Sequence, residues 1–230
     1  LQAERDAAEL ARLALLEERL ASVEGESVTL GSVLEIARGG SPRPIDDFLT
    51  DADDGLNWIK IGDVPPDGRY ITQTAQKIRP EGLSKTRQVK SGDFLLSNSM
   101  SFGRPYILRI DGCIHDGWLV LSEVDKAFDD EFLYFLLRSR KVQDQFRSLA
   151  AGSGVKNLNI KVVNSVEVVL PPREEQASIA EEISRWMNLI DEIDAELEAL
   201  REVRATLLNA LLSGTRVVPY SYDSLLSEVA

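Results

Sequence analysis

The chain has 230 residues and a formal net charge of −12, with 43% hydrophobic and 28% charged residues. These values suit one sizeable folded domain with accessory elements and exclude an intrinsically disordered chain. No run of about 18 apolar residues is present, which excludes a membrane-spanning helix, and the single cysteine, Cys113, excludes an internal disulfide and a cysteine-based zinc site.

Residues 1–26 are predicted to be an N-terminal helical segment, with the helix over residues 1–24 and its end at Gly25. Two interpretations of its apolar stripe stay open: packing against the chain's own core, or packing against a partner helix. The segment has neither the basic n-region nor the apolar h-region of an export signal, so we expect a cytoplasmic protein. The stripe consists of Leu10, Leu13, Leu16, Leu20 and Val23.

Residues 27–170 are predicted to form a mixed domain of the α+β class. One amphipathic helix is expected over residues 130–149. Few strands alternate with helices, which favours an irregular α+β fold over a doubly wound sheet. Short β-rich runs, separated by turn signals, are expected at residues 56–61, 76–78, 93–96, 106–110, 118–122 and 165–170.

Residues 171–214 are predicted to form one long coiled-coil helix, because no Gly or Pro interrupts the chain between Pro172 and Ser213. Some 40 residues make a rod of about 60 Å, so part of its apolar seam is expected to face a partner helix. Residues 215–230 are predicted to be a loosely attached tail. The seam repeats in steps of four and three through Ile179, Ile183, Trp186, Ile190, Ile193, Leu197, Leu200, Leu207 and Leu211, with Arg204 as its polar exception.

The acidity lies mostly at the two ends of the chain. Residues 27–170 carry 18 basic and 19 acidic residues, whereas residues 171–230 carry 5 basic and 12 acidic ones. A nearly neutral domain has enough Lys and Arg to make one face basic. The net charge therefore does not exclude a nucleic-acid partner.

A series of short motifs runs through residues 29–216. Gly39-Gly40-Ser41-Pro42 opens the series, and Leu170-Pro171-Pro172-Arg173-Glu174-Glu175-Gln176 leads into the long helix. Between and after them come WIKIGD at 58–63, GDFLLS at 92–97, GR at 103–104, GWLV at 117–120, GSGVKNL at 152–158 and LLSG at 211–214. In order and spacing, these motifs resemble those of the DNA-specificity (S) subunits of type I restriction-modification systems.

The resemblance implies a target recognition domain that reads one half of a split DNA site and has no catalytic residues. It implies helices that set the distance between half-sites and dock methyltransferase (M) subunits. The implied partners are double-stranded DNA, M subunits, restriction/translocase subunits and a second copy bound through the long helix. S-adenosylmethionine, ATP and Mg²⁺ would belong to partner subunits, so no cofactor or metal is expected on this chain.

Complete S subunits carry two recognition domains and two spacer helices, whereas this chain has one domain. The resemblance therefore leaves two possibilities open: a half-sized subunit that pairs with itself, or the C-terminal half of a longer subunit.

The candidate DNA contacts are hydrogen-bond donors on loops rich in Gly, Ser and Pro. Arg or Lys can pair with guanine, and Asn98 or Asn157 with adenine. The alternative is that these residues are solvated or bond to their own backbone. Lys85, Arg87 and Lys90 are expected to touch phosphate or nothing. The candidates are Ser41, Arg43 and Lys60, then Ser97, Asn98, Ser99, Ser101 and Arg104, and finally Ser153, Lys156, Asn157 and Asn159.

Enzymatic alternatives lack the necessary residues. His115 is the single histidine, and no motif ties a nucleophile to it, so it is expected to be a structural hydrogen-bonding residue. Cys113 is expected to be a small core residue. Ser153 and Lys156 fit a serine/lysine pattern whose partner motifs are absent, and the acidic run at 51–54 lacks the later Glu of a calcium loop.

A second function stays open beside DNA recognition: a coiled-coil assembly protein whose mixed domain binds another protein and no nucleic acid. DNA recognition requires donor-rich loops that converge on one face, whereas protein assembly requires an exposed apolar patch on the mixed domain.

Overall fold

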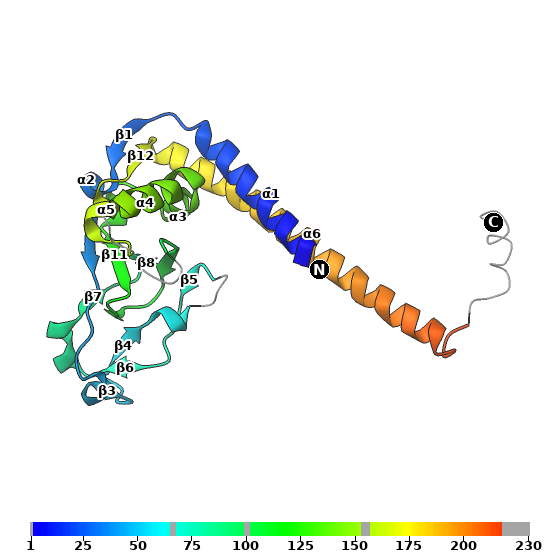
Figure 1. The fold of residues 1–230 in the computed structure, drawn as a ribbon, viewed down its shortest axis with the longest axis horizontal. Helices are drawn as coiled ribbons and strands as arrows, with labels where there is room; N and C mark the ends of the chain where they lie inside the picture. Colours follow the sequence, from blue (N-terminus) through cyan, green and yellow to red (C-terminus); the bar gives the residue numbers. More distant parts are fainter. Residues whose placement is uncertain (1, 65–67, 99–101, 153–156, 218–230) are drawn as a thin grey trace. The chain divides into compact units, whose positions relative to one another are not determined.

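The computed structural model describes residues 2–64, 68–98, 102–152 and 157–217. The chain forms two compact units, Leu13–Ile183 and the described parts of Leu1–Arg12 and Ser184–Ala230. The larger unit contains both helices and sheets, which confirms the predicted α+β class (Figure 1).

In the described part of the larger unit, the strands form three sheets. A two-stranded sheet pairs β1 (Glu26–Thr29) with β12 (Glu167–Leu170). One five-stranded sheet has the order β3 (Leu49–Thr50), β6 (Lys77–Ile78), β4 (Leu56–Ile59), β10 (Gly112–Ile114), β7 (Arg87–Val89). The other has the order β2 (Glu35–Arg38), β11 (Trp118–Ser122), β8 (Phe94–Ser97), β9 (Pro105–Leu108), β5 (Tyr70–Ile71). The β4–β10 and β5–β9 pairs are parallel, and the other pairs are antiparallel.

The main core lies between the two five-stranded sheets. Successive side chains of a strand point to opposite faces, so Ile59 and Ile114, which pair across β4 and β10, face the other sheet. There they join one buried cluster with Trp118 of β11. The preceding pair, Trp58 and Cys113, faces away and packs in a second cluster with Ile78.

All six β-rich runs predicted from the sequence contain a strand, but several ends differ. The run 56–61 stops at Ile59 because the chain turns into the 3₁₀ helix η2 (Ile61–Asp63), where the Asp63 side chain accepts from the Lys60 N–H. The strands β1, β2, β3, β5, β7 and β10 were not predicted. Each depends on pairing with a strand elsewhere in the chain, which the local sequence does not record.

The single helix predicted over residues 130–149 is wrong, because two helices lie there. Helix α3 (Asp130–Arg138) and helix α4 (Arg140–Gly152) are separated at Ser139, which has extended ψ of 147°. The Ser139 hydroxyl donates to the Leu136 carbonyl at 2.7 Å and lies 3.4 Å from the Val142 amide, so it bonds to the backbone of both helices. A helix-like apolar pattern does not record this break, since both helices keep an apolar face.

Short helices complete the larger unit. Helix α2 (Leu30–Val33) contacts α5 (Ile160–Asn164), and α4 contacts both α3 and α5 (Figure 1). Three further 3₁₀ helices are η1 (Ile45–Asp47), η3 (Pro80–Lys85) and η4 (Val124–Lys126).

The two predicted long helices are present, but both are shorter than the predicted ranges 1–26 and 171–214, and Glu26 already belongs to β1. Helix α1 spans Gln2–Ala21, and α6 spans the 40 residues Arg173–Leu212. Ile179 and Ile183 of the predicted seam are buried, Ile190 and Leu211 are half-buried, and five other seam residues are exposed. Their exposed fractions are 48% at Trp186, 48% at Ile193, 43% at Leu197, 57% at Leu200 and 39% at Leu207. None of the described helices has the length and apolar character needed to cross a membrane.

Candidate nucleic-acid interface

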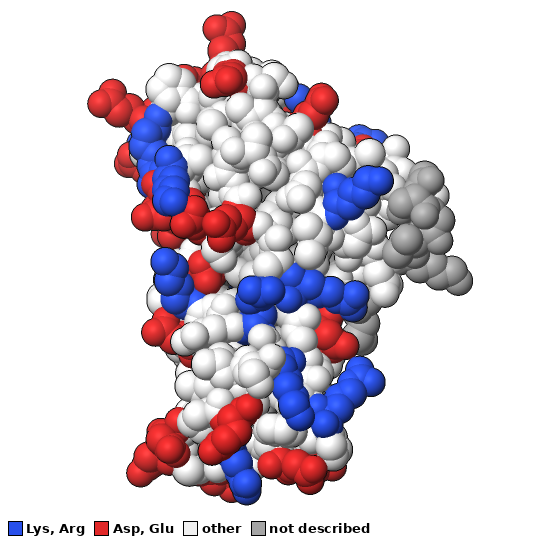
Figure 2. Space-filling view, turned by 90° about the vertical axis from the view of Figure 1, so that its left-hand side faces the viewer, with Lys and Arg blue, Asp and Glu red and all other residues white. Residues whose placement is uncertain are grey.

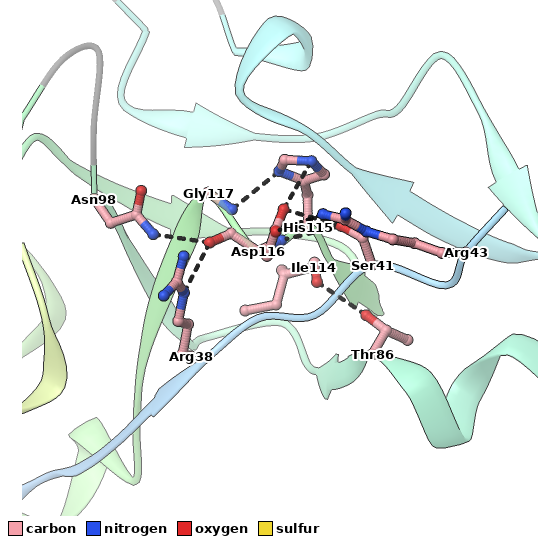
Figure 3. A network of polar contacts seen from close by, with 9 residues as sticks. All are labelled: Arg38, Ser41, Arg43, Thr86, Asn98, Ile114, His115, Asp116 and Gly117. Carbon is pink, nitrogen blue, oxygen red and sulfur yellow. Dashed lines mark hydrogen bonds and ion pairs between the residues drawn. The ribbon is translucent and has the colours of Figure 1, made fainter. Parts of the chain in front are cut away.

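Asp116, on the turn between β10 and β11, joins several of the predicted loops (Figure 3). Its carboxylate oxygen Oδ1 accepts from Ser41 Oγ at 3.0 Å and lies 2.9 Å from His115 Nε2. Its other oxygen, Oδ2, lies 3.6 Å from Arg43 Nη2. One carboxylate therefore holds two side chains of the loop that contains the Gly-Gly-Ser-Pro motif.

The backbone carbonyl of Asp116 makes a second set of contacts. It accepts from Arg38 Nε at 3.1 Å and from Asn98 Nδ2 at 2.8 Å (Figure 3). The Asn98 carbonyl in turn accepts from the Leu158 amide at 2.9 Å, which brings the loop at 157–159 beside it. We call Arg38, Ser41, Arg43, Asn98, His115 and Asp116 the Asp116 network.

The two glycines of the Gly-Gly-Ser-Pro motif are required by close backbone approach. A Cβ at Gly39 would lie 2.1 Å from the His115 carbonyl oxygen, and one at Gly40 would lie 2.8 Å from that of Lys85. Both amides donate to backbone carbonyls, Gly39 to Trp118 at 3.0 Å and Gly40 to Ile114 at 3.1 Å. Any larger residue at position 39 would separate the loop from the 115–117 turn.

Basic side chains lie around the Asp116 network. The Arg43 side chain is 81% exposed, and Lys85 and Arg87 are exposed on η3 and β7. Strand β7 sets the position of Lys85 and Arg87, because Arg87 pairs with Ile114 and the Thr86 hydroxyl donates to the Ile114 carbonyl at 2.9 Å. Figure 2 views the side on which Figure 1 draws β2 and β7, and it shows Lys and Arg side chains gathered across the middle of this face.

The structure brings some predicted contact residues together and gives others internal roles. Ser41 and Arg43 meet at Asp116. Lys60 follows Ile59, and the Ile59 carbonyl accepts from the His115 amide at 3.1 Å. The Lys60 Nζ donates to Gln76 Oε1 at 2.7 Å. Asn157 is exposed. These residues keep their predicted role as candidates.

Three other candidates fit the alternative interpretation, that they bond to the chain itself. Asn98 is 2% exposed and its amide points at the Asp116 carbonyl; we therefore do not retain it as an adenine reader. Ser97 is buried, and Asn159 caps α5 by accepting from the Val162 amide at 3.0 Å. Ser97 and Asn98 are shielded from solvent, and the Asn159 side chain is engaged in the cap, so these groups are not free for a base edge.

Arg104 is half-buried, and its guanidinium lies 5.5 Å from the centroid of the Tyr106 ring. The remaining candidates, Ser99, Ser101, Ser153 and Lys156, lie outside the residues that the structure describes.

Sequence reasoning missed Arg38, Thr86 and Asp116. The Asp116-Gly117 dipeptide is a turn signal, and it was the available clue. His115 has the predicted structural role, since its Nδ1 accepts from the Gly117 amide at 3.0 Å while Nε2 faces Asp116.

The titratable groups give no sign of a metal centre among the described residues, where no group of three His, Cys, Asp or Glu side chains is suitably placed. Burial raises the pKa of Asp93, whose carboxylate accepts from the Lys90 amide at 2.9 Å at the start of β8.

The Asp116 network and the basic side chains beside it offer hydrogen-bond donors, guanidinium and ammonium groups around one carboxylate. This arrangement is suited to recognition of polar and anionic groups.

A family model described as the type I restriction modification DNA specificity domain matches residues 22–200. The chain belongs to this family. The match covers every motif from Gly-Gly-Ser-Pro to the entry of α6, and it confirms the resemblance found in the sequence. In this DNA specificity domain, the motif glycines at 39 and 40 and the GWLV motif at 117–120 meet at the Asp116 network.

Relatives and solved structures agree with the family. The type I restriction enzyme MjaVIII specificity subunit of Methanocaldococcus jannaschii is 28% identical over 126 residues, which cover 54% of this chain and 29% of that protein. The HsdS subunit from Thermoanaerobacter tengcongensis has the same fold, with a TM-score of 0.61 at 21% identity over 91% of this chain and 54% of its own.

A chain from a structure of complex assembly and conformational transition of the type I R-M system reaches a TM-score of 0.69 at 22% identity, covering 91% of this chain and 52% of its own. The present chain thus corresponds to about half the length of these two solved chains, and the likeness to them establishes the fold.

Proposed function

We propose that this chain reads one half of a split DNA site as part of a type I restriction-modification complex. The observation that carries the proposal is the placement of four of the family's motifs: Gly-Gly-Ser-Pro, WIKIGD, GDFLLS and GWLV meet at or directly beside the Asp116 network, near exposed Arg43, Lys85 and Arg87. Donors on such loops suit base edges in the major groove, while guanidinium and ammonium groups suit the flanking phosphates.

The long helix supplies the spacing and the partner contacts. Its 40 residues make a rod of about 60 Å, comparable with about 18 base pairs, so it can hold two readers on successive turns of DNA. Its exposed apolar side chains after Ser184 support packing against a partner helix, from a second reader or from an M subunit. Methylation and cleavage, with their cofactors, would come from the M and restriction/translocase subunits.

Protein assembly without nucleic acid is the less favoured function. It requires an apolar patch on the larger unit, where the exposed large apolar side chains among the described residues are Tyr70, Leu83 and Leu149. These three lie on β5, η3 and α4, and each is 36% exposed. Isolated apolar side chains of this kind are common on any protein surface.

Selection from random DNA tests the proposal. The full chain, together with its M subunits, is incubated with randomised duplexes, and the bound fraction is amplified and sequenced. We expect enrichment of a motif in two halves with a fixed gap, and salt-sensitive binding that weakens when M subunits are omitted. Recovery of random sequence from a complex that binds DNA would contradict sequence reading.

A further inference from the structure

In the proposed function this surface faces the phosphates of DNA, and Asp116 places a negative charge within it. Its side chain is 32% exposed, so the carboxylate reaches the surface. A carboxylate facing DNA weakens binding to every sequence alike. Its presence in this position therefore calls for a role that offsets the lost affinity.

The contacts of the carboxylate indicate that role. Arg43 is 81% exposed on a loop, and alone its guanidinium could contact any phosphate in reach. At 3.6 Å from Asp116 Oδ2, the guanidinium is held beside the carboxylate by a contact longer than a hydrogen bond, which a better acceptor can replace. Ser41 is held more tightly, with its hydroxyl 3.0 Å from Oδ1.

We propose that Asp116 is a positioning residue for base discrimination: its carboxylate orients Arg43 and Ser41, and its charge disfavours DNA that offers phosphates without the matching base edge. This inference rests on the proposed function. Specificity of this kind is a difference between two affinities, and a repulsive group raises it by penalising the wrong partner.

The residue can be tested without dismantling the loop. The backbone carbonyl of Asp116, which holds Arg38 and Asn98, is unchanged in Asp116→Asn. An asparagine oxygen can still accept from Ser41, so the substitution removes chiefly the charge and its pull on Arg43. Asp53→Asn is the matched control, because Asp53 is exposed on the same unit and loses the same charge.

The measurement is the affinity of the full chain with M subunits for the selected duplex and for an unrelated duplex, over a range of salt. For Asp116→Asn we expect several-fold tighter binding to the unrelated duplex and a ratio of the two affinities that falls about tenfold, while Asp53→Asn keeps the ratio. A loosened fold would lower both affinities, so the rise on unrelated DNA separates positioning from structural support. An unchanged ratio in Asp116→Asn, or an equal change in Asp53→Asn, would overturn the inference.

Two variants of Arg43 test the same inference from the guanidinium side, and the second leaves Asp116 unchanged. In an Arg43→Ala background, Asp116→Asn should change the ratio much less than in the wild type, and fully additive effects would contradict action through Arg43. Arg43→Lys keeps the charge and loses the planar fork, so it should retain affinity for unrelated DNA and lose discrimination. A wild-type ratio in Arg43→Lys would also refute the inference. If the wild-type complex enriches no motif, the proposed function itself fails, which is a distinct result.

Discussion

Cys113 shows how the position of a residue on a strand determines its burial and its reactivity. It pairs with Trp58 across β4 and β10 and is fully buried with Ile78, as expected for a core residue. Burial raises the pKa of the Cys113 thiol to about 11, because the thiolate would lose its hydration. A buried thiol with this pKa is a poor nucleophile at neutral pH.

The thiol should therefore react only when the protein unfolds. Ellman's reagent at about pH 8 should label native protein slowly, and denaturant should speed the labelling in step with the unfolding transition. Immediate stoichiometric labelling under native conditions would contradict the burial of Cys113.

The same shift predicts the sign of a pH effect. Because the pKa of the Cys113 thiol is higher in the folded state than the ordinary value of 9.0, its contribution to stability is complete below about pH 9 and declines as the pH rises toward 11. The stability advantage of wild type over Cys113→Ala should thus shrink by roughly 1 kcal/mol between about pH 8 and about pH 10. Urea unfolding at the two pH values measures it, and an advantage that grows with pH would show that the sign is wrong.

At the scale of elements, Gln176 explains the Pro-Pro-x-x-Glu-Gln motif. It is 1% exposed in the first turns of α6, where its Oε1 accepts from the Asp129 amide at 2.8 Å. Its Nε2 donates to the carbonyls of Ala127 and Pro171, both at 3.0 Å. One side chain therefore fastens the start of α6 to the segment that begins α3.

Gln176→Ala should destabilise the protein by about 2–4 kcal/mol, because it leaves one amide and two carbonyls without their partner. Ser178→Ala, an exposed position on the same helix, should change the free energy of unfolding by less than about 0.5 kcal/mol. Chemical denaturation of both variants measures the difference, and equal midpoints would refute the role assigned to Gln176.

The two glycines at positions 39 and 62 make a second comparison at this scale. A Cβ at Gly39 meets the His115 carbonyl at 2.1 Å, whereas one at Gly62 meets nothing within 4 Å. Gly39→Ala should therefore cost about 1–3 kcal/mol and reduce selection of the DNA motif, while Gly62→Ala should be neutral for stability. Thermal unfolding and motif selection check both variants. Loss of motif selection in Gly62→Ala with unchanged stability would point instead to close approach of DNA at η2.

At the scale of the whole molecule, the exposed seam of α6 governs association. Leu200 is 57% exposed on a helix that continues to Leu212, and the seam predicts that a partner covers it. Leu200→Glu should weaken self-association or M-subunit binding at least tenfold, because the carboxylate would be desolvated in the seam. Ala199→Glu, which adds the same charge outside the seam, should not. Mass measured against concentration tests this, and equal weakening by both variants would contradict the seam.

The sequence by itself determined the features that depend on near neighbours. The absence of Gly and Pro and the four-three repeat predicted α6, whose bounds Arg173–Leu212 lie within two residues of the predicted 171–214 at each end, and the ordered motifs identified the family. These signals are local because helix periodicity and turn chemistry are set by residues a few positions apart.

Only the tertiary structure decided which residues meet. Ser41 and Asp116 form a hydrogen bond although they lie 75 residues apart in the sequence. Asn98, a candidate base reader in the sequence, instead donates to the Asp116 carbonyl within the chain. Strands as short as β7 and β10 exist because β10 pairs with both β7 and β4, which no local pattern records. Long-range hydrogen bonds depend on the completed fold, so the arrangement of the interface was decided there.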